Sequence, residues 1–381
     1  MAGPQTTSTF LRQDGTWEPS GLTRAAGERE FAPSVSYDRG KIIFIGGGND
    51  VVTKEPTNMT ETIDLDQTPG DRMWRLAKSL AIKRRQHNAT VLPDGTVLGT
   101  GGTKGPGFSN VEPGHPVKTP ELWTPPSNAS PPFNDNWTQM ADASEDQRCY
   151  HSIALLLPDG QVLSAGSGEG ANNPPVISAP LFRPPYLCRG AQSTLVVAPL
   201  EIDHDQKTFD VTVGAGDLIK RASWIRIGTV THANNMSQTF MWLLCKQEES
   251  KVTIAAPDNK NLTPPGHYML FLLDDYGVPL RPSYVARMVD GVRIKDALNN
   301  IICLKGPKLG ASHGQSTKPV LHTLRRSVAA DDSSHHLPAL NEKIISEQDR
   351  PAVVIGLTPV YPCGLGACCG GPVTLYRGSR M

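Results

Sequence analysis

The chain has 381 residues, and its 37 Lys and Arg residues balance 37 Asp and Glu residues. A net charge of zero removes the general electrostatic attraction on which nucleic-acid and anionic-membrane binding depend, so we expect neither as a partner. No segment reaches the ~20 consecutive apolar residues of a membrane-spanning helix, and the N-terminal residues show no signal-peptide pattern. The 36 Gly and 33 Pro residues favour many short strands joined by turns, so the composition predicts an all-β protein.

Three segments of the chain repeat one pattern. They read FAPSVSYDRGKIIFIGG at residues 31–47, HNATVLPDGTVLGTGG at residues 87–102 and HSIALLLPDGQVLSAG at residues 151–166. Each is an apolar run, a short turn and a second apolar run that ends in glycine. In the last two segments the turn is Pro-Asp-Gly, in which proline fixes φ and glycine accepts a positive φ. The sequence therefore predicts three β-hairpins.

A further strand is predicted downstream of each hairpin, at Glu61–Leu65, Glu121–Trp123 and Ser178–Phe182. Four short strands in a unit of about 50 residues, with a terminal glycine pair, are typical of the kelch repeats of a β-propeller. We interpret residues 31–190 as propeller blades and residues 1–30 as the remnant of a preceding blade. The alternative is a β-sandwich whose segments are alike by accident. Three visible units are fewer than the ~4 blades that close a propeller, so we expect a partial one.

The pattern changes after the third unit. Residues 193–290 hold seven short apolar segments with alternating character, which is typical of an immunoglobulin-like β-sandwich. We assign residues 191–290 to this second domain. Residues 291–381 are mixed in composition and end in a stretch rich in Gly and Cys, so we interpret them as a weakly ordered tail with room for one short helix.

The best candidates for chemistry are one tyrosine and two histidines. Tyr150 and His151 are adjacent at the start of the third hairpin, and His232 follows a predicted sandwich strand. Adjacent residues of a strand point to opposite faces unless the backbone bends, so the pair can serve one metal ion only where the strand begins at the propeller axis. Two imidazoles and a phenolate suit Cu(II) better than zinc or magnesium. Spacing alone leaves a purely structural Tyr-His pair open.

Longer motifs help to decide between a metal site and a purely structural Tyr-His pair. The stretches YHSIALLLPDGQVLSAG, APLFRPPYL, IRIGTVTHANN and PPGHYMLFLLDDYGVPLRPSYVAR follow one another, and RRQHNATVLPDG and APSVSYDRGKIIFIGGGND precede them. This series resembles the radical-copper oxidases of the galactose oxidase and glyoxal oxidase family, and the resemblance covers about residues 30–290. In that family a kelch propeller holds one copper ion near its axis. An early-set, immunoglobulin-like C-terminal domain sends a loop into the propeller to complete the site.

The resemblance implies a role for five residues of this chain. Tyr150 matches the family's axial tyrosine ligand, which makes it the catalytic candidate, and His151 matches the first equatorial histidine. His232 matches the second histidine ligand, which the sandwich domain supplies. Arg84 matches an arginine that binds substrate in some members, and His87 matches a histidine that lies near the copper ion without binding it. The implied cofactor is a single copper ion, and the implied setting is mostly extracellular.

The chain also departs from the family pattern. The family's radical forms on a second tyrosine, in an Arg-x-Tyr motif of an earlier blade, that is cross-linked to a cysteine; this sequence has no counterpart of it. Tyr37 aligns with a tyrosine of an outer blade strand, so we expect a structural role for it. Two hypotheses follow. The first is an oxidase that uses O₂ to oxidise a small alcohol, aldehyde or carbohydrate and releases H₂O₂. The second is a truncated, non-catalytic propeller–sandwich remnant or a carbohydrate-binding module.

Overall fold

The computed structural model describes residues 5–12, 14–48, 55–128, 132–142, 146–168, 174–257, 259, 262–282, 284–289, 292–298 and 301–305. All of these residues belong to one compact unit. Within them, helical structure is limited to two short 3-10 helices, η1 (Pro69–Asp71) and η2 (Pro185–Cys188). No helix in this described part of the chain is long and apolar enough to span a bilayer.

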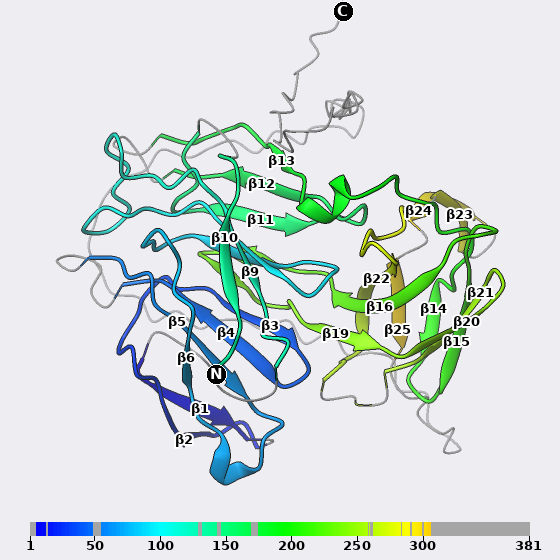
Figure 1. The fold of residues 1–381 in the computed structure, drawn as a ribbon, viewed down its shortest axis with the longest axis horizontal. Helices are drawn as coiled ribbons and strands as arrows, with labels where there is room; N and C mark the ends of the chain where they lie inside the picture. Colours follow the sequence, from blue (N-terminus) through cyan, green and yellow to red (C-terminus); the bar gives the residue numbers. More distant parts are fainter. Residues whose placement is uncertain are drawn as a thin grey trace, which may run out of the picture. The chain divides into compact units, whose positions relative to one another are not determined.

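The N-terminal part forms antiparallel units of the propeller type (Figure 1). The first sheet runs in the order β3 (Ser34–Asp38), β4 (Lys41–Ile45), β5 (Thr60–Asp64) and β6 (Arg75–Ala77). The second runs in the order β7 (Asn88–Val91), β8 (Val97–Thr100), β9 (Glu121–Thr124) and β10 (Asn136–Gln139). The third contains β11 (Ser152–Leu156), β12 (Val162–Gly166) and β13 (Leu181–Phe182). The three predicted hairpins are therefore present.

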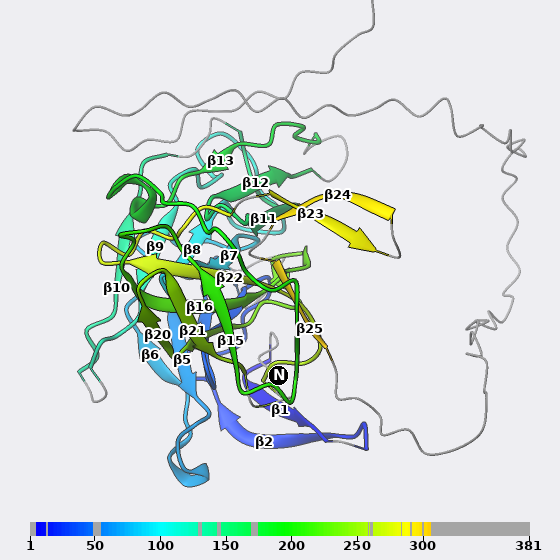
Figure 2. The ribbon, with the colours of Figure 1, turned by 90° about the vertical axis from the view of Figure 1, so that its right-hand side faces the viewer.

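A separate hairpin precedes the first blade. Its strands are β1 (Thr7–Leu11) and β2 (Trp17–Thr23), which pair only with each other among the described strands (Figure 2). The indole of Trp74 donates a hydrogen bond to the Ser8 hydroxyl at 2.9 Å, and the Arg24 guanidinium lies over the Phe44 ring, 4.1 Å from its centroid. These contacts fasten the hairpin to the first blade.

The C-terminal part is a sandwich of two sheets. One sheet runs in the order β14 (Glu201–Asp203), β25 (Ile301–Lys305), β22 (Gly266–Asp274), β16 (Ile219–Arg226) and β19 (Phe240–Leu243). The other runs in the order β15 (Thr208–Thr212), β21 (Lys251–Ala255) and β20 (Cys245–Glu248). Two hairpins complete the described strands, β17 (Val230–Thr231) with β18 (Asn234–Asn235), and β23 (Tyr284–Val289) with β24 (Val292–Leu298). The all-β fold class, a partial propeller followed by a sandwich, is confirmed.

The sandwich extends beyond the boundary that we predicted at residue 290. Strand β25 lies between β14 and β22, and its residues Ile302 and Leu304 are buried in the sandwich core. The burial of two side chains at alternate positions makes this segment an integral strand, although we assigned it to a weakly ordered tail. The rest of the predicted tail, from residue 306 onward, lies outside the described residues.

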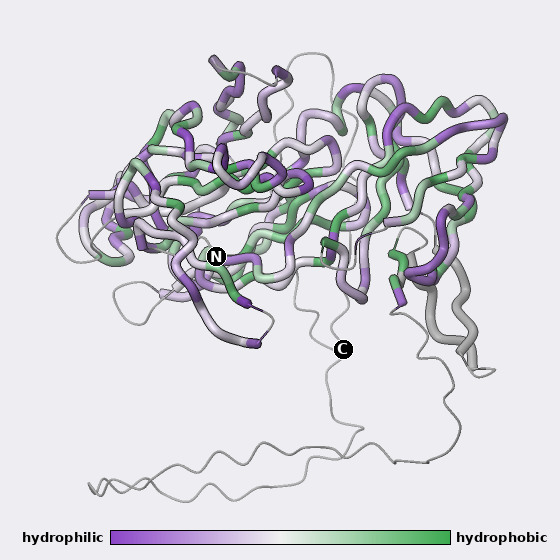
Figure 3. The backbone as a smooth tube through the Cα atoms, turned by 90° about the horizontal axis from the view of Figure 1, so that it is seen from below, coloured by the Kyte–Doolittle hydropathy of each residue, from purple (hydrophilic) through white to green (hydrophobic). Residues whose placement is uncertain are grey.

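Strand β22 is apolar on both faces. Tyr268, Leu270 and Leu272 point into the core between the two sandwich sheets, whereas the intervening Met269 and Phe271 belong to a second core. A strand that is buried on both faces reads as a continuous apolar run, which accounts for the segment YMLFLL. Figure 3 shows such hydrophobic segments along the interior strands and hydrophilic ones in the connecting loops.

This second core joins the sandwich to the blades. From the sandwich it takes Ile225, Phe240, Met269, Phe271 and Leu273, and from the blades it takes Val35, Tyr37, Ile43, Ile45, Leu80, Ala89, Val91, Val97, Trp123 and Trp137. Strand β19 contacts β3, and β18 contacts both β3 and β7. Because the two parts share one apolar core, the sandwich is fixed against the first strands of the blades.

Tyr37 is one of the residues in the shared core. It lies on β3, the first strand of its blade, and not on an outer strand as we expected. Its ring packs edge-on against Trp123 with a centroid distance of 4.8 Å, and its side chain is buried. Burial, with nearby carboxylates adding to it, raises the pKa of the Tyr37 phenol far above its usual value.

One buried side chain bonds the sandwich directly to the backbone of the second blade. The Gln238 amide donates to the Ala89 carbonyl at 3.2 Å and accepts from the Val91 backbone N–H at 2.7 Å. Gln238 thereby takes the place of a neighbouring strand along β7. Since only 8% of its surface is exposed, both backbone groups would be buried without a partner if the amide were absent.

We predict that Gln238→Leu lowers the free energy of unfolding by about 2–4 kcal/mol, because each unpartnered buried backbone group costs about 1–3 kcal/mol. Urea unfolding at neutral pH measures the change. Gln139→Leu is the matched control, since Gln139 is exposed on β10 and its replacement is expected to alter stability by less than about 0.5 kcal/mol. Equal effects of the two substitutions would show that the amide bridge contributes nothing.

Candidate metal centre

The structure brings three aromatic side chains together where the sandwich meets the third blade. The ring centroids of Tyr150 and His151 are 4.0 Å apart, and those of Tyr150 and His232 are 5.2 Å apart. The two imidazole centroids are separated by 5.0 Å, with the ring planes at 87°. We refer to Tyr150, His151 and His232 as the ring cluster. Two of its members precede β11, and the third lies between β17 and β18.

A bend in the backbone explains how adjacent residues reach one place. His151 has a φ of 60°, in the left-handed region that residues other than glycine rarely adopt. Phe31 and Gln86, with φ of 52° and 58°, occupy the equivalent position in the other two blades, nine residues before the glycine of each hairpin turn. The left-handed residue is therefore a repeated feature of the blades. In the first two blades one residue separates this position from a preceding arginine, Arg29 or Arg84. In the third blade two residues separate His151 from Arg148, and Tyr150 is the extra one.

The hairpin that carries His232 is equally constrained. His232 and Ala233 form a two-residue loop between β17 and β18, and both have a positive φ, 52° and 64°. This pairing of angles is typical of a type I′ turn, which usually contains Asn and Gly. For other residues the left-handed conformation costs about 1–2 kcal/mol each. The Asn234 amide steadies the loop by donating to the His232 carbonyl at 3.1 Å. Such strain at a loop tip is a mark of functional sites.

Both imidazoles use Nδ1 for a hydrogen bond to a neighbouring oxygen. His151 Nδ1 lies 2.9 Å from the Gly168 carbonyl oxygen, which can only accept a hydrogen bond. Nδ1 of His151 therefore carries the ring proton, and Nε2 keeps its lone pair. His232 Nδ1 lies 2.6 Å from the Thr231 hydroxyl, and no hydrogen bond joins its Nε2 to another described residue. Two neutral imidazole nitrogens and a phenol oxygen are a ligand set that Cu(II) accepts.

An aromatic wall flanks the ring cluster. Phe108 packs edge-on against Tyr150 with a centroid distance of 4.8 Å, and Phe31 lies 6.1 Å from the same ring. The ring centroids of Phe31 and Phe108 are 5.4 Å apart. His151 and His232 are exposed, so the cluster has an apolar side and an open side. A small molecule that approaches from solvent can reach the imidazoles while an apolar part of it contacts Phe108.

His87 lies apart from these ring contacts, in a buried position on the second blade. It is fully buried, and neither ring nitrogen has a hydrogen-bond partner among the described residues. A side chain on Gly46 or Gly102 would collide with it, at 3.0 Å from Cε1 and 2.9 Å from Cβ, so the glycines make room for the ring. Desolvation, and secondarily the charge of Arg84, hold the pKa of His87 well below its usual value. That His87 lies near a bound copper ion without binding it stays a prediction.

Arg84 is also buried. Its guanidinium donates to Glu121 Oε1 at 2.5 Å, to the Thr119 carbonyl at 3.1 Å and to the Gly101 carbonyl at 3.3 Å. The Glu121 carboxylate in turn accepts the backbone N–H groups of the segment that enters the blade, at 2.6 and 3.1 Å. Arg29 makes the same kind of pair with Glu61 in the first blade. These contacts are those of a structural ion pair, and the predicted substrate-binding role of Arg84 stays a prediction.

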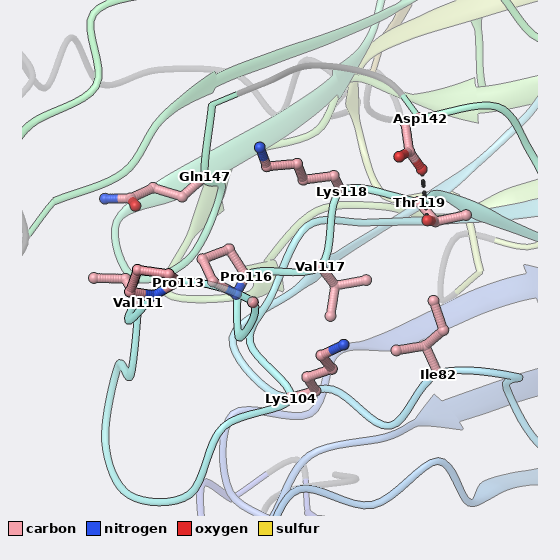
Figure 4. Close-up of a pocket in the computed structure, with 11 residues that line it drawn as sticks. Ile82, Lys104, Val111, Pro113, Pro116, Val117, Lys118, Thr119, Asp142 and Gln147 are labelled. Atoms are coloured by element: carbon pink, nitrogen blue, oxygen red, sulfur yellow. Dashed lines mark hydrogen bonds between the residues drawn. The ribbon is translucent and has the colours of Figure 1, made fainter.

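A cavity of about 440 Å³ opens at another place on the blades (Figure 4). It is lined by Lys104, Lys118, Thr119, Asp142 and Gln147 together with apolar residues of the β8–β9 connection. The Thr119 hydroxyl donates to Asp142 at 2.6 Å across its wall. No member of the ring cluster lines this cavity, so it is separate from the candidate metal centre.

The chain is similar to several known proteins. Residues 193–288 match the family model "Galactose oxidase-like, Early set domain". A galactose oxidase of Gibberella zeae is 31% identical over 296 residues, which make up 73% of this chain and 42% of that protein. This chain is a homologue of the galactose oxidases. The resemblance to the galactose oxidase and glyoxal oxidase family that the motifs indicated is thus confirmed.

The chain is also similar to an aldehyde oxidase and to an alcohol oxidase. The aldehyde oxidase GLOX1 of Arabidopsis thaliana is 26% identical over 229 residues, 54% of this chain and 36% of that protein. A fungal alcohol oxidase of the AA5 family, solved in complex with copper, aligns with a TM-score of 0.63 and 26% identity. That alignment covers 73% of this chain and 59% of the oxidase. The chain spans less than half the length of the curated relatives that it matches.

The sequence motifs led to the ring cluster but not to its surroundings. Phe31 and Phe108 were not singled out, because an isolated phenylalanine in a loop carries no signal of its contacts. Gly168 acts through its carbonyl, which any residue possesses, and Thr231 is one of many threonines. The position of Phe31, nine residues before the turn glycine as in His151, was the one available signal for it.

We predict that Arg84→Met lowers the free energy of unfolding by about 3–5 kcal/mol, since it leaves the Glu121 carboxylate buried without its cation. Urea unfolding measures the loss. Lys246→Met is the control, because it removes a cation from an ion pair that is largely exposed, and no measurable change is expected. A stable Arg84→Met protein would instead favour a role for Arg84 outside the fold.

A pH dependence is predicted for His87. Its pKa is depressed in the folded state, so the unfolded chain binds a proton that the folded chain excludes, and stability falls as the pH drops below about 6.5. Between about pH 7.5 and pH 5.5 the wild type should lose about 1.4 kcal/mol more than His87→Leu. Unfolding in urea at the two pH values gives both differences. Parallel losses in the two proteins would mean that His87 protonates freely in the folded state.

Proposed function

We propose that the chain binds one copper ion through Tyr150, His151 and His232, and that this site belongs to an oxidase of primary alcohols or aldehydes. The observation that supports the proposal is the convergence of the three rings, while both histidines use Nδ1 for their hydrogen bonds to other described residues. The relatives add to it, because they include galactose oxidases, an aldehyde oxidase and an alcohol oxidase in complex with copper.

The donor set fits the metal. Imidazole nitrogens and a phenolate oxygen are suitable ligands for Cu(II), and a carbonyl orients the first imidazole. The described residues contain no group of three or more His, Cys, Asp or Glu side chains, so a carboxylate or thiolate site is not supported within them. Bound copper would supply one-electron exchange between its two common oxidation states. Every other contribution must come from the protein.

The residues around the site suggest how a substrate would be handled. Tyr150 is only partly buried, so its oxygen can meet a substrate hydroxyl that enters from the open side. When ionised, the phenol can accept the proton of that hydroxyl. Phe108 and Phe31 exclude water from one side of the Tyr150 ring and restrict the orientation of the substrate. These roles favour a small primary alcohol or an aldehyde hydrate, both of which present a C–H bond beside an O–H group.

The proposed overall reaction converts an alcohol and O₂ to an aldehyde and H₂O₂. It removes two electrons and two protons from the substrate and transfers them to oxygen. Copper carries one electron, so turnover also needs a second one-electron carrier. The resemblance assigns that function to a cross-linked tyrosine that has no counterpart in this sequence. A second candidate is a copper-binding propeller–sandwich protein without turnover, which needs only the three side chains of the ring cluster.

Copper binding is predicted to depend on both imidazoles. His151→Ala and His232→Ala should each weaken Cu(II) binding at least about 100-fold, because each removes a direct ligand. Isothermal titration of the metal-free chain with a weak competing chelator measures the affinity. His267→Ala is the control, since His267 is exposed on β22, and its affinity should equal that of the wild type. Equal affinity of all four proteins would rule out the proposed site.

Turnover is tested separately from binding. A peroxidase-coupled assay of the copper-loaded chain with galactose, glycerol, glyoxal and methylglyoxal reports H₂O₂ directly. Peroxide that requires copper and disappears in Tyr150→Phe supports the oxidase. Copper binding that depends on His151 and His232, with no peroxide from any of these substrates, supports the copper-binding protein without turnover.

A further inference from the structure

The hydroxyl of Thr231 lies within hydrogen-bond distance of Nδ1 of His232. The distance from Thr231 Oγ1 to His232 Nδ1 is 2.6 Å. A hydroxyl can donate or accept a hydrogen bond, and the direction decides the tautomer of the ring. If the hydroxyl accepts from Nδ1–H, then Nε2 has a lone pair that faces the ring cluster. If the hydroxyl donates, then Nε2 carries the proton and cannot bind a metal ion.

The surroundings of Thr231 favour the accepting role. The side chain is exposed, so its own proton can be donated to water while the oxygen accepts from Nδ1–H. Threonine is β-branched and therefore stiff about χ1, which holds the hydroxyl in place. The backbone pairing of Thr231 with Asn234 fixes the residue directly beside the strained loop. The same arrangement occurs at His151, where the Gly168 carbonyl leaves no choice of tautomer.

We propose that Thr231 is a positioning residue that keeps the ring proton of His232 on Nδ1 and directs Nε2 toward Tyr150 and His151. This inference rests on the proposed copper function, because it states which atom of His232 binds Cu(II). The Thr231 hydroxyl contacts neither the ion nor the substrate. It acts only through the imidazole, as residues behind a metal ligand commonly do.

Three variants of one hairpin test the inference. Thr231→Val keeps the branched shape and removes the hydroxyl, and it should weaken Cu(II) binding about 10- to 100-fold. Thr231→Ser restores a hydroxyl and should return the affinity to within about threefold of the wild type. Thr229→Val is the matched control, since the Thr229 hydroxyl contacts Ser237 Oγ at 3.0 Å on the same hairpin and not His232. It should bind Cu(II) as the wild type does.

A spectroscopic measurement separates positioning from a general loss of structure. Pulsed electron paramagnetic resonance of the Cu(II) protein detects the nitrogen of each imidazole that does not bind the metal, and its quadrupole coupling responds to the hydrogen bond at that atom. Thr231→Val should shift the coupling of one of the two remote nitrogens, and Thr229→Val should shift neither. If the valine variant unfolds at a lower temperature than the wild type, Thr231→Ala is used with the same expectation.

The outcomes separate this inference from the proposed function. If His232→Ala weakens Cu(II) binding while Thr231→Val matches Thr229→Val in affinity and in both remote-nitrogen couplings, then the copper site stands and the role of Thr231 is refuted. If His232→Ala binds Cu(II) as the wild type does, the site itself is refuted. A loss in Thr231→Val that Thr231→Ser reverses, together with the shift of one nitrogen, supports the inference.

Discussion

The site depends on one packing interaction, the apolar core that the sandwich shares with the first strands of the blades. His232 belongs to the sandwich and Tyr150 to the third blade, so nothing in either part alone sets their separation. Residues such as Phe271 on β22 and Val91 on β7 are fully or almost fully buried in this shared core. At roughly 25 cal/mol per Å² of buried apolar surface, several such side chains outweigh the strain of two left-handed residues in the His232 loop. The packing can therefore hold a loop that would not persist by itself.

The orientation of the sandwich relative to the blades is fixed by polar contacts rather than by the apolar core. Apolar packing is not directional, so it brings the two parts together without fixing their register. The two hydrogen bonds of Gln238 with the backbone of β7 have a defined geometry and lie a few residues from the His232 loop. The first two blades each contain a directional contact of a buried arginine, with Glu61 for Arg29 and with Glu121 for Arg84. Directional contacts of this kind suit a metal centre, whose ligands must be held to within about 0.5 Å of the productive geometry.

The sequence allowed the fold to be predicted because hairpins leave local signals, whereas the ring cluster was expected only from the family resemblance. The Pro-Asp-Gly turns and the alternation of apolar residues are short-range patterns, and they placed the hairpins β7–β8 and β11–β12 correctly. Strand β25 was missed because its partners β14 and β22 are distant in sequence. A strand that pairs in this way is not preceded by a hairpin turn whose residues could be recognised. The ion pair of Arg84 with Glu121 was not predicted, because the two residues lie 37 positions apart in the chain. Contacts between residues that are distant in sequence could not be predicted from short sequence patterns.

The repeated left-handed position shows how a structural unit can acquire a site. Phe31, Gln86 and His151 have nearly the same φ at the same place in successive blades, so the strain belongs to the repeat and not to the chemistry. What differs is the side chain. Phe31 packs near Tyr150, Gln86 is buried with its amide unpartnered, and His151 contributes an imidazole to the ring cluster. One backbone conformation thus serves an apolar wall, a buried polar group and a candidate ligand. The extra residue before His151 adds a phenol beside it, and the sandwich supplies the second imidazole from outside the repeat. The candidate site in this chain therefore differs from the other blades in its side chains at a fixed scaffold position, which is the sense in which a site is built onto a fold.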